Sequence, residues 1–205
     1  MVVYNKLVMK KLKALFIAIC TMGLITGCIG APKALENNLK VEKSYEVTQT
    51  IYEPFAESYY NIDELKDMIL SEAASHNQVY GSGNVSVNKV SLNGENAEVI
   101  LKYASSDDFD KFNGVKLYVG TIENAVAKEE SLKVILTDVT DPTKTISEPD
   151  IKALTGDNIL ITECADTVFL PSKVLFASDN VDVLEGGRSV KKKDGETGLI
   201  YVIYN

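Results

Sequence analysis

Histidine and tryptophan are the scarcest residue types in this sequence: the 205-residue chain contains one histidine, His76, and no tryptophan. A Ser-His-Asp or Cys-His enzyme, or a metal ion bound by histidine, would therefore have to use His76. His76 shares a helical face with Leu65 and Ile69, which favours a packing role over a chemical one. The motifs of metalloproteases, nucleophile-elbow hydrolases, kinases and dinucleotide-binding proteins are absent. We therefore predict no catalytic residue, no metal site and no cofactor. These observations argue against an enzyme but do not exclude one.

Basic side chains are outnumbered, with 21 lysine and arginine residues against 29 aspartate and glutamate residues. The first 27 residues hold four of the lysines and no acid, so the remaining chain has 17 basic and 29 acidic side chains and a net charge of −12. A nucleic-acid-binding protein needs a basic surface to neutralise phosphates. The sequence therefore predicts no nucleic-acid partner, and anionic lipid headgroups would repel this surface as well.

The chain also lacks an apolar run long enough to span a bilayer as a helix, which takes about 20 residues. The longest candidate, Ala14 to Ile25, is twelve residues long. Lysines precede it and the small residues Thr26 and Gly27 follow it, which is the three-part pattern of a secretory signal peptide. We predict a signal peptide over residues 1–27. Translation could begin at Met1 or at Met9, and both starts lead to the same mature protein.

The end of this segment, Ile25, Thr26, Gly27 and Cys28, resembles the lipobox of bacterial lipoproteins. The resemblance implies that a diacylglyceryl group is attached to the Cys28 sulfur and that a signal peptidase cuts before Cys28. Two acyl chains of the palmitate type hold a protein stably on a membrane. The resemblance therefore predicts lipidation at Cys28 and attachment to the extracytoplasmic face of the cell membrane. The alternative is an ordinary cleaved signal followed by a chance cysteine. The abundance of lysine over arginine and of asparagine favours a Gram-positive host.

Cysteine is scarce in the part of the chain that would remain after processing. Cys20 would leave with the signal peptide and Cys28 would carry lipid, so Cys164 would be the one remaining thiol. The mature domain is therefore predicted to have no internal disulfide. Cys164 follows the apolar run at residues 159–162, which favours a buried, unreactive thiol. A reactive pair of Cys164 and His76 is the alternative.

The mature chain is predicted to consist of a tether at residues 28–40 and a single α+β domain at residues 41–205. Residues 41–52 alternate between apolar and polar side chains, which indicates a strand. Residues 61–76 have the 3.6-residue period of an amphipathic helix, with Asn61 as its cap. The proline-containing stretch at residues 140–149 marks a second option, a subdivision near residue 145.

A β-hairpin is predicted around Asn93-Gly94, with Ala97 to Tyr103 placing alternate apolar side chains on one face. Short helices are predicted at residues 121–130 and 147–154. Short strands are predicted at residues 115–120, 132–139, 159–162, 168–170, 173–178 and 199–205. This order of elements favours an α+β fold in which an amphipathic helix packs on a largely antiparallel sheet, with a β-rich C-terminal part.

Three aspartates, Asp107, Asp108 and Asp110, form the acidic stretch that comes nearest to a cation site. Carboxylates bind hard cations, but this stretch lacks the glycine and the distal glutamate of a calcium loop. Serine and aspartate before an apolar position are also typical of a helix start. The helix start is the favoured interpretation.

Two further clusters could bind a partner. The first cluster is aromatic and consists of Tyr52, Phe55, Tyr59 and Tyr60. Packing against the adjacent helix is the favoured interpretation over ligand binding, because such clusters are usually part of a core. The second cluster is basic and consists of Arg188, Lys191, Lys192 and Lys193. It could contact wall polymers or anionic lipid, but the favoured interpretation is that these residues protect an exposed strand edge.

Two classes of function remain open. The favoured class is a membrane-anchored extracytoplasmic binding or structural module, with an envelope protein or a wall polymer as its partner. The alternative is a cell-envelope hydrolase that acts on peptidoglycan or peptide through an unfamiliar site. A pocket at which carboxylates converge, or at which His76 meets Cys164, would favour the enzyme. A broad apolar or aromatic surface patch would favour binding.

Overall fold

A computed structural model describes residues 35–205, which form one compact unit. The predicted signal peptide at residues 1–27 and the predicted lipidation site Cys28 lie outside the described residues. Between Leu35 and Asn205, no helix combines the length and the apolar character needed to cross a bilayer.

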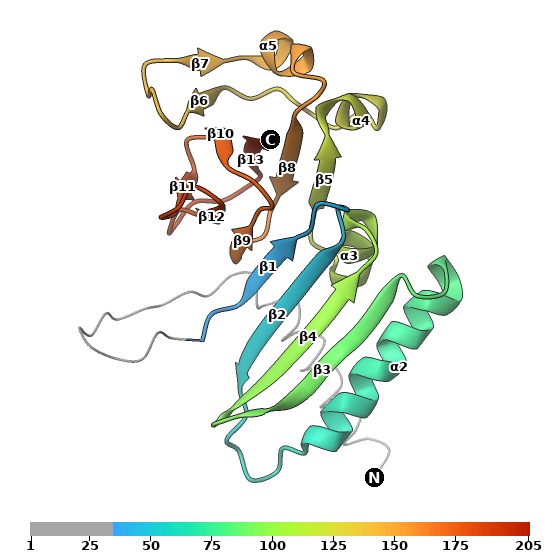
Figure 1. Cartoon of the computed structure of the whole chain (residues 1–205). Helices are drawn as coiled ribbons and strands as arrows, with labels where there is room; N and C mark the ends of the chain where they lie inside the picture. The colour runs from blue at the N-terminus through green and yellow to red at the C-terminus, as the bar shows by residue number, and fades with distance from the viewer. Residues whose placement is uncertain (1–34) are drawn as a thin grey trace, which may run out of the picture. The chain divides into compact units, whose positions relative to one another are not determined.

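The described residues contain two β-sheets, both mostly antiparallel (Figure 1). The first sheet has seven strands in the order β11-β12-β9-β1-β2-β4-β3. Its one parallel pairing joins β1 to β9. The strands of this sheet are β1 (Asn38–Val41), β2 (Val47–Pro54), β3 (Val85–Asn93), β4 (Asn96–Tyr103), β9 (Thr167–Phe169), β11 (Val181–Val183) and β12 (Ser189–Lys192).

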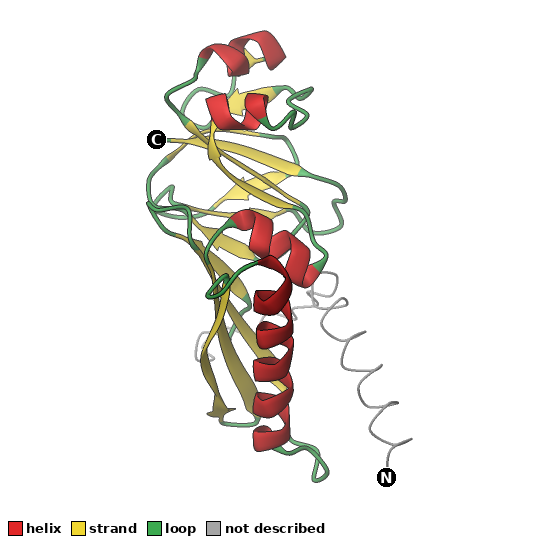
Figure 2. Cartoon of the chain, turned by 90° about the vertical axis from the view of Figure 1, so that its right-hand side faces the viewer, coloured by secondary structure: helices red, strands yellow, loops and turns green. Residues whose placement is uncertain are grey.

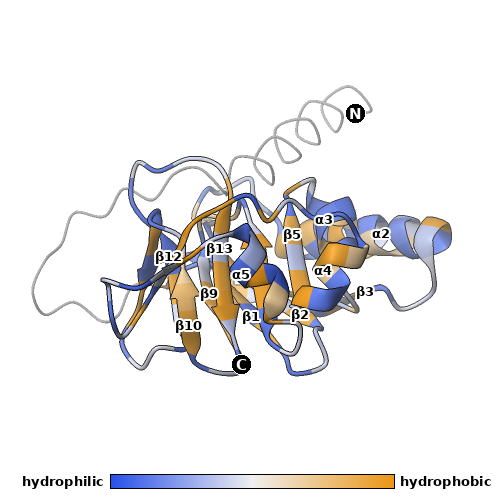
Figure 3. Cartoon of the chain, turned by 90° about the horizontal axis from the view of Figure 1, so that it is seen from above, coloured by the Kyte–Doolittle hydropathy of each residue, from blue (hydrophilic) through white to orange (hydrophobic). Residues whose placement is uncertain are grey.

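The second sheet has six strands in the order β5-β8-β13-β10-β6-β7. These strands are β5 (Leu117–Thr121), β6 (Leu136–Asp138), β7 (Thr145–Ile146), β8 (Asn158–Thr162), β10 (Val174–Ala177) and β13 (Ile200–Tyr204). Hydrophobic residues run along β13 and β5 (Figure 3). They pack with two short helices, α4 (Ile122–Ala127) and α5 (Glu148–Ala153), in a core that includes Tyr118, Ile122, Leu136, Ile151, Ile159 and Ile203.

The longest described helix, α2 (Ile62–Tyr80), packs on the first sheet beside β3 (Figure 2). The Asn61 side chain accepts hydrogen bonds from the backbone N–H groups of Asp63 and Glu64, so the predicted cap is confirmed. The buried residues of α2 are Ile69, Ala73 and His76, and these lie on the predicted face. The helix continues to Tyr80, four residues beyond its predicted end at residue 76. The predicted α+β fold, with an amphipathic helix packed on a largely antiparallel sheet, is confirmed.

The hairpin predicted at Asn93-Gly94 is also confirmed. Strands β3 and β4 pair up to this turn, with one register shift between Val87 and Lys89, and Gly94 has a φ of 62°, which glycine adopts without strain. The alternate apolar side chains of β4, from Ala97 to Tyr103, are between 0% and 4% exposed. This face of β4 therefore lies in the core.

The single strand predicted over residues 41–52 is wrong. Residues 38–41 form β1, the chain turns between Glu42 and Glu46, and β2 begins at Val47. Tyr45 leaves the alternating pattern with a φ of 66°, and its hydroxyl donates to Asn158 Oδ1 at 2.7 Å. This contact ties the turn to β8 in the other sheet. Residues 38–40, which the sequence analysis assigned to the tether, form most of β1.

The two sheets are interleaved along the chain. Strands β9, β11 and β12 follow residue 145 and still belong to the first sheet, whereas β5 precedes it and belongs to the second. A cut near residue 145 would therefore divide both sheets. Of these strands, β11 and β12 were missed by the sequence analysis because they are short and contain charged residues.

Candidate functional site

His76 is buried at the contact between α2 and α3 (Ser106–Asn113). Its Nε2 lies 3.5 Å from Asp108 Oδ1, and this buried nitrogen has no hydrogen-bond partner among the described residues. The ring packs against Tyr80 at 4.7 Å and Phe112 at 5.7 Å between centroids. These contacts place His76 among packing residues.

The three aspartates of α3 have separate surroundings. Asp108 is buried and accepts hydrogen bonds from Ser105 Oγ at 2.6 Å and Asn84 Nδ2 at 2.8 Å. Asp107 forms an ion pair with Lys128, and burial raises the pKa of Asp110. Ser105 caps the helix by accepting from the Asp108 backbone N–H, which confirms the helix-start interpretation. In the described part of the chain, no three histidine, cysteine, aspartate or glutamate side chains are grouped to hold a metal ion.

Cys164 is fully buried, as the sequence predicted, and follows β8. Its backbone N–H donates to Thr162 Oγ1 at 3.0 Å, and its thiol is hydrogen-bonded to the Asp166 carboxylate. His76, in contrast, contacts Tyr80 of α2 and Asp108 and Phe112 of α3. The contacts described for the two residues give no sign of a nucleophile and base pair.

Native Cys164 is expected to react slowly with a neutral alkylating reagent at neutral pH, and quickly in denaturant, because burial keeps the reagent away from the thiol. The rate of iodoacetamide modification, followed by mass spectrometry, measures this. The comparison uses the His76→Ala variant of the same chain. Fast modification of the native protein that is lost in His76→Ala would show an activated pair and would contradict the packing interpretation.

Glu53, in β2, and Asp166, which directly precedes β9, are two carboxylates whose charges interact. Neither was predicted from the sequence. Burial raises the pKa of Asp166 to about 6, against the opposing effects of the Cys164 hydrogen bond and the Lys191 charge. The Oδ2 atom of Asp166 is buried and has no hydrogen-bond partner among the described residues. Burial, together with the charge of Asp166, also raises the pKa of Glu53. No sequence signal marks Asp166, because its environment is created by strands far apart in the chain.

Asp166→Asn is expected to stabilise the protein at neutral pH. The folded state binds the Asp166 proton more tightly than the unfolded chain does, so this group lowers the free energy of unfolding as the pH rises from about 4 to about 6. The amide removes that cost, and we expect a gain of about 1 to 3 kcal/mol near pH 7.5 that vanishes near pH 4. Urea unfolding at the two pH values measures it. The control is Asp182→Asn, which changes an exposed aspartate in the same way. A gain in the free energy of unfolding of Asp166→Asn that is equal at both pH values would contradict the explanation.

The aromatic cluster, defined here as Phe55, Tyr59 and Tyr60, lies in the loop between β2 and α2. The prediction that these rings belong to the core is wrong for the two tyrosines, because Tyr59 is 70% exposed and Tyr60 is 39% exposed. The first fully buried residue of α2 is Ile69, so the first turns of the helix, which follow the aromatic cluster, hold no fully buried side chain. Tyr52, the fourth aromatic residue of this stretch, is half-buried in β2 with its hydroxyl 3.5 Å from Glu98 Oε1.

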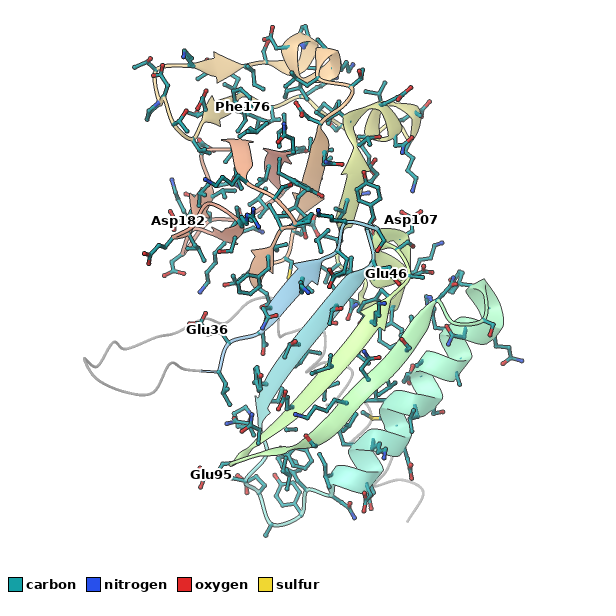
Figure 4. The ribbon with its side chains drawn as sticks, in the orientation of Figure 1. Glu36, Glu46, Glu95, Asp107, Phe176 and Asp182 are labelled. Atoms are coloured by element: carbon teal, nitrogen blue, oxygen red, sulfur yellow. The ribbon has the colours of Figure 1, made fainter. Side chains whose placement is uncertain are left out.

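The loop that carries the aromatic cluster is held in place by ring and backbone contacts. Phe55 stacks on Tyr60 at 4.8 Å between centroids, and Tyr59 meets Tyr60 edge-on at 4.8 Å. The Phe55 backbone N–H donates to the Glu95 carbonyl at 2.7 Å, which joins the loop to the β3–β4 turn. Figure 4 shows Glu95 at that turn, beside the loop that leads into α2. The rings are therefore arranged before any partner binds.

The basic cluster does not form the edge of a sheet. Strand β12 pairs with β11 on one side and β9 on the other, so the strand-edge interpretation is wrong for it. Lys192 is buried and donates to the Glu163 carbonyl at 2.6 Å, and Lys193 donates to the Asp179 carbonyl at 2.6 Å. Two of the lysines are therefore engaged by backbone carbonyls within the fold.

One open hollow lies on the surface at the β1–β2 turn, and neither Glu53 nor Asp166 lines it. Its lining is mostly charged and consists of Glu42, Lys43, Ser44, Glu46, Lys102 and Pro171. Lys102 and Glu46 form an ion pair across it at 2.9 Å. These groups neutralise each other and show no arrangement of an acid and a base around a bound substrate.

Comparisons with family models, curated proteins and solved structures find no match. The function is therefore argued from the residues of this chain. The aromatic cluster is the feature that sets its surface apart, since it gathers three rings of which two are exposed.

Proposed function

We propose that this chain is a lipid-anchored extracytoplasmic module of the cell envelope that binds a partner through its aromatic cluster. The observation that carries the proposal is the exposure of Tyr59 and Tyr60 in a loop that already holds their rings in contact. The lipobox-like sequence ending at Cys28 supports the anchor.

Exposed, ordered tyrosines are suited to binding because a tyrosine ring buries a large area at a small entropic cost and keeps a hydroxyl for hydrogen bonding. The contacts of Phe55 with Tyr60 and Glu95 reduce the loop ordering that binding would otherwise require. A ring that only stabilised the domain would be expected beneath α2 and not in front of its first turn. These features favour an interaction surface.

The second candidate function is a cell-envelope hydrolase acting on peptidoglycan or peptide, and the raised pKa of Asp166 favours it. A carboxyl group that titrates near pH 6 can donate a proton to a leaving group. If Asp166 has this role, Asp166→Asn abolishes the release of soluble fragments from purified peptidoglycan. Wild-type protein that releases no fragments would leave the binding function as the better account.

Site-specific photo-crosslinking in intact cells tests the binding function. A benzoylphenylalanine residue in place of Tyr60 is expected to crosslink a partner, because the aromatic cluster would lie in the interface. The matched control places the same residue at Phe169, which is 44% exposed on β9. A defined adduct from position 60 and none from position 169 supports the proposal. Equal labelling from both positions, or none from either, would contradict it.

A further inference from the structure

We propose that the aromatic cluster and the carboxylates around it bind a basic segment of a partner protein, with arginine or lysine side chains lying against the tyrosine rings. This inference rests on the proposed binding function and specifies the chemistry of the partner. It follows from three observations: the exposed rings, the charge of the surrounding residues, and the absence of ion-pair partners for that charge among residues 35–205.

The rings offer the electron-rich faces that cations prefer. A lysine or arginine within about 6 Å of a tyrosine centroid is attracted to the ring face. The same chain contains such contacts, since Lys111 lies 5.1 Å from the centroid of Tyr80 and Lys128 lies 5.8 Å from that of Tyr118. Tyr59 is 70% exposed, and Tyr60, one face of which stacks on Phe55, is 39% exposed, so a cation of another molecule can reach both rings.

The surroundings of the aromatic cluster are acidic. Between residues 53 and 67 the one basic side chain is Lys66, and the β3–β4 turn adds another acid next to the loop (Figure 4). Both segments are joined by the backbone hydrogen bond between Phe55 and Glu95. The exposed carboxylates of this acidic rim are Glu57, Asp63, Glu64, Asp67 and Glu95.

Among residues 35–205, no ion pair joins any of the five carboxylates of the acidic rim to a basic side chain. Elsewhere some carboxylates are paired, as Glu98 is with Lys89 at 2.9 Å and Glu46 is with Lys102 at 2.9 Å. A surface of one sign next to an apolar patch attracts a partner of the opposite sign and speeds its association.

The charge also argues against anionic molecules as the partner of the tyrosine rings. Wall polymers that carry phosphate or carboxylate groups would be repelled by the acidic rim, and so would an anionic bilayer surface. A peptide with arginine or lysine residues combines cationic groups with apolar stems. Such a peptide satisfies both the rings and the carboxylates.

The test measures binding of a fluorescein-labelled peptide of alternating arginine and glycine to the full chain, purified from membranes in non-ionic detergent. Fluorescence anisotropy is recorded at low salt. The double variant Tyr59→Ala/Tyr60→Ala is expected to bind at least about tenfold more weakly than wild type. Phe169→Ala, which removes an exposed ring outside the cluster, is expected to bind like wild type. A far-ultraviolet circular dichroism spectrum and a urea midpoint equal to those of wild type show that each variant is folded.

The acidic rim is tested in the same assay. Glu57→Gln/Glu95→Gln is expected to weaken binding about fivefold or more and to reduce its salt dependence, whereas Glu185→Gln, an exposed acid in another loop, is expected to have little effect. Equal binding by the tyrosine double variant and by Phe169→Ala would show general attraction to an acidic protein and would overturn the inference.

The inference and the proposed function fail in different ways. Crosslinks from position 60 without binding of the arginine peptide would overturn the basic partner and leave the binding function standing. Tyrosine-dependent binding of wall polysaccharide or of lipid vesicles in place of the peptide would do the same. The absence of any crosslink from position 60 would overturn the proposed function itself.

Discussion

Cys28→Ala is expected to release the protein from the membrane fraction and to abolish its labelling by a fatty acid. Without the thiol there is no sulfur to carry the diacylglyceryl group, and the acidic surface of the remaining chain gives no electrostatic attachment to anionic lipid. Metabolic labelling with an alkyne fatty acid, followed by fractionation of the cells, measures both effects. The urea midpoint of the released protein should remain close to that of wild type, because Cys28 precedes the described domain.

Cys20→Ala is the matched control for this prediction. Cys20 is expected to leave with the signal peptide, so its replacement should change neither the label nor the fraction in which the protein is found. Labelling of Cys28→Ala at the level of wild type would contradict lipidation at this residue.

Ile69→Ala is expected to lower the free energy of unfolding by about 2 to 5 kcal/mol, the range for truncation of a large buried aliphatic side chain. Ile69 is 2% exposed and lies on the face of α2 that packs on the first sheet. Removal of its side chain would leave a cavity between the helix and β3. Urea unfolding of the full-length protein measures the change.

Lys66→Ala provides the control on the same helix, since Lys66 is exposed and makes no ion pair with a described residue. We expect its effect to stay within about 0.5 kcal/mol. A midpoint that moves as little for Ile69→Ala as for Lys66→Ala would mean that the helix does not bury this face.

Local signals were sufficient for the elements that form from neighbouring residues. Asn93-Gly94 specifies its hairpin because the turn requires a positive φ at the glycine, and the cap at Asn61 specifies where α2 begins. The 3.6-residue period of α2 then identifies the buried positions Ile69, Ala73 and His76. The fold class follows from this helix and hairpin together.

Long-range contacts account for the elements that were predicted wrongly. The parallel pairing of β1 with β9 joins residues that are more than a hundred positions apart in the chain, and so does the hydrogen bond from Tyr45 to Asn158. Residues 41–52 look like one strand because apolar side chains alternate in their sequence, whereas in the fold Tyr45 has a φ of 66° and its hydroxyl donates to Asn158 Oδ1. Periodicity carries no information on which distant strand becomes a neighbour.

The candidate site shows the same division. The exposure of Tyr59 and Tyr60 depends on where α2 starts to pack, and this position is set by the sheet beneath the helix. Likewise, the raised pKa of Asp166 results from burial in the folded chain, which the residues around it in sequence do not indicate. The sequence identified the aromatic residues as a group but assigned Tyr59 and Tyr60 to the wrong environment, and it gave no reason to consider Asp166.

The mass of the N-terminal peptide from membrane-extracted protein tests the central claim most directly. We expect that, after digestion, this peptide begins at Cys28 and carries the mass of a diacylglyceryl group on its sulfur. A peptide that begins elsewhere, or one in which Cys28 is unmodified, would contradict a lipid-anchored module and would leave an ordinary cleaved signal with a chance cysteine as the better description.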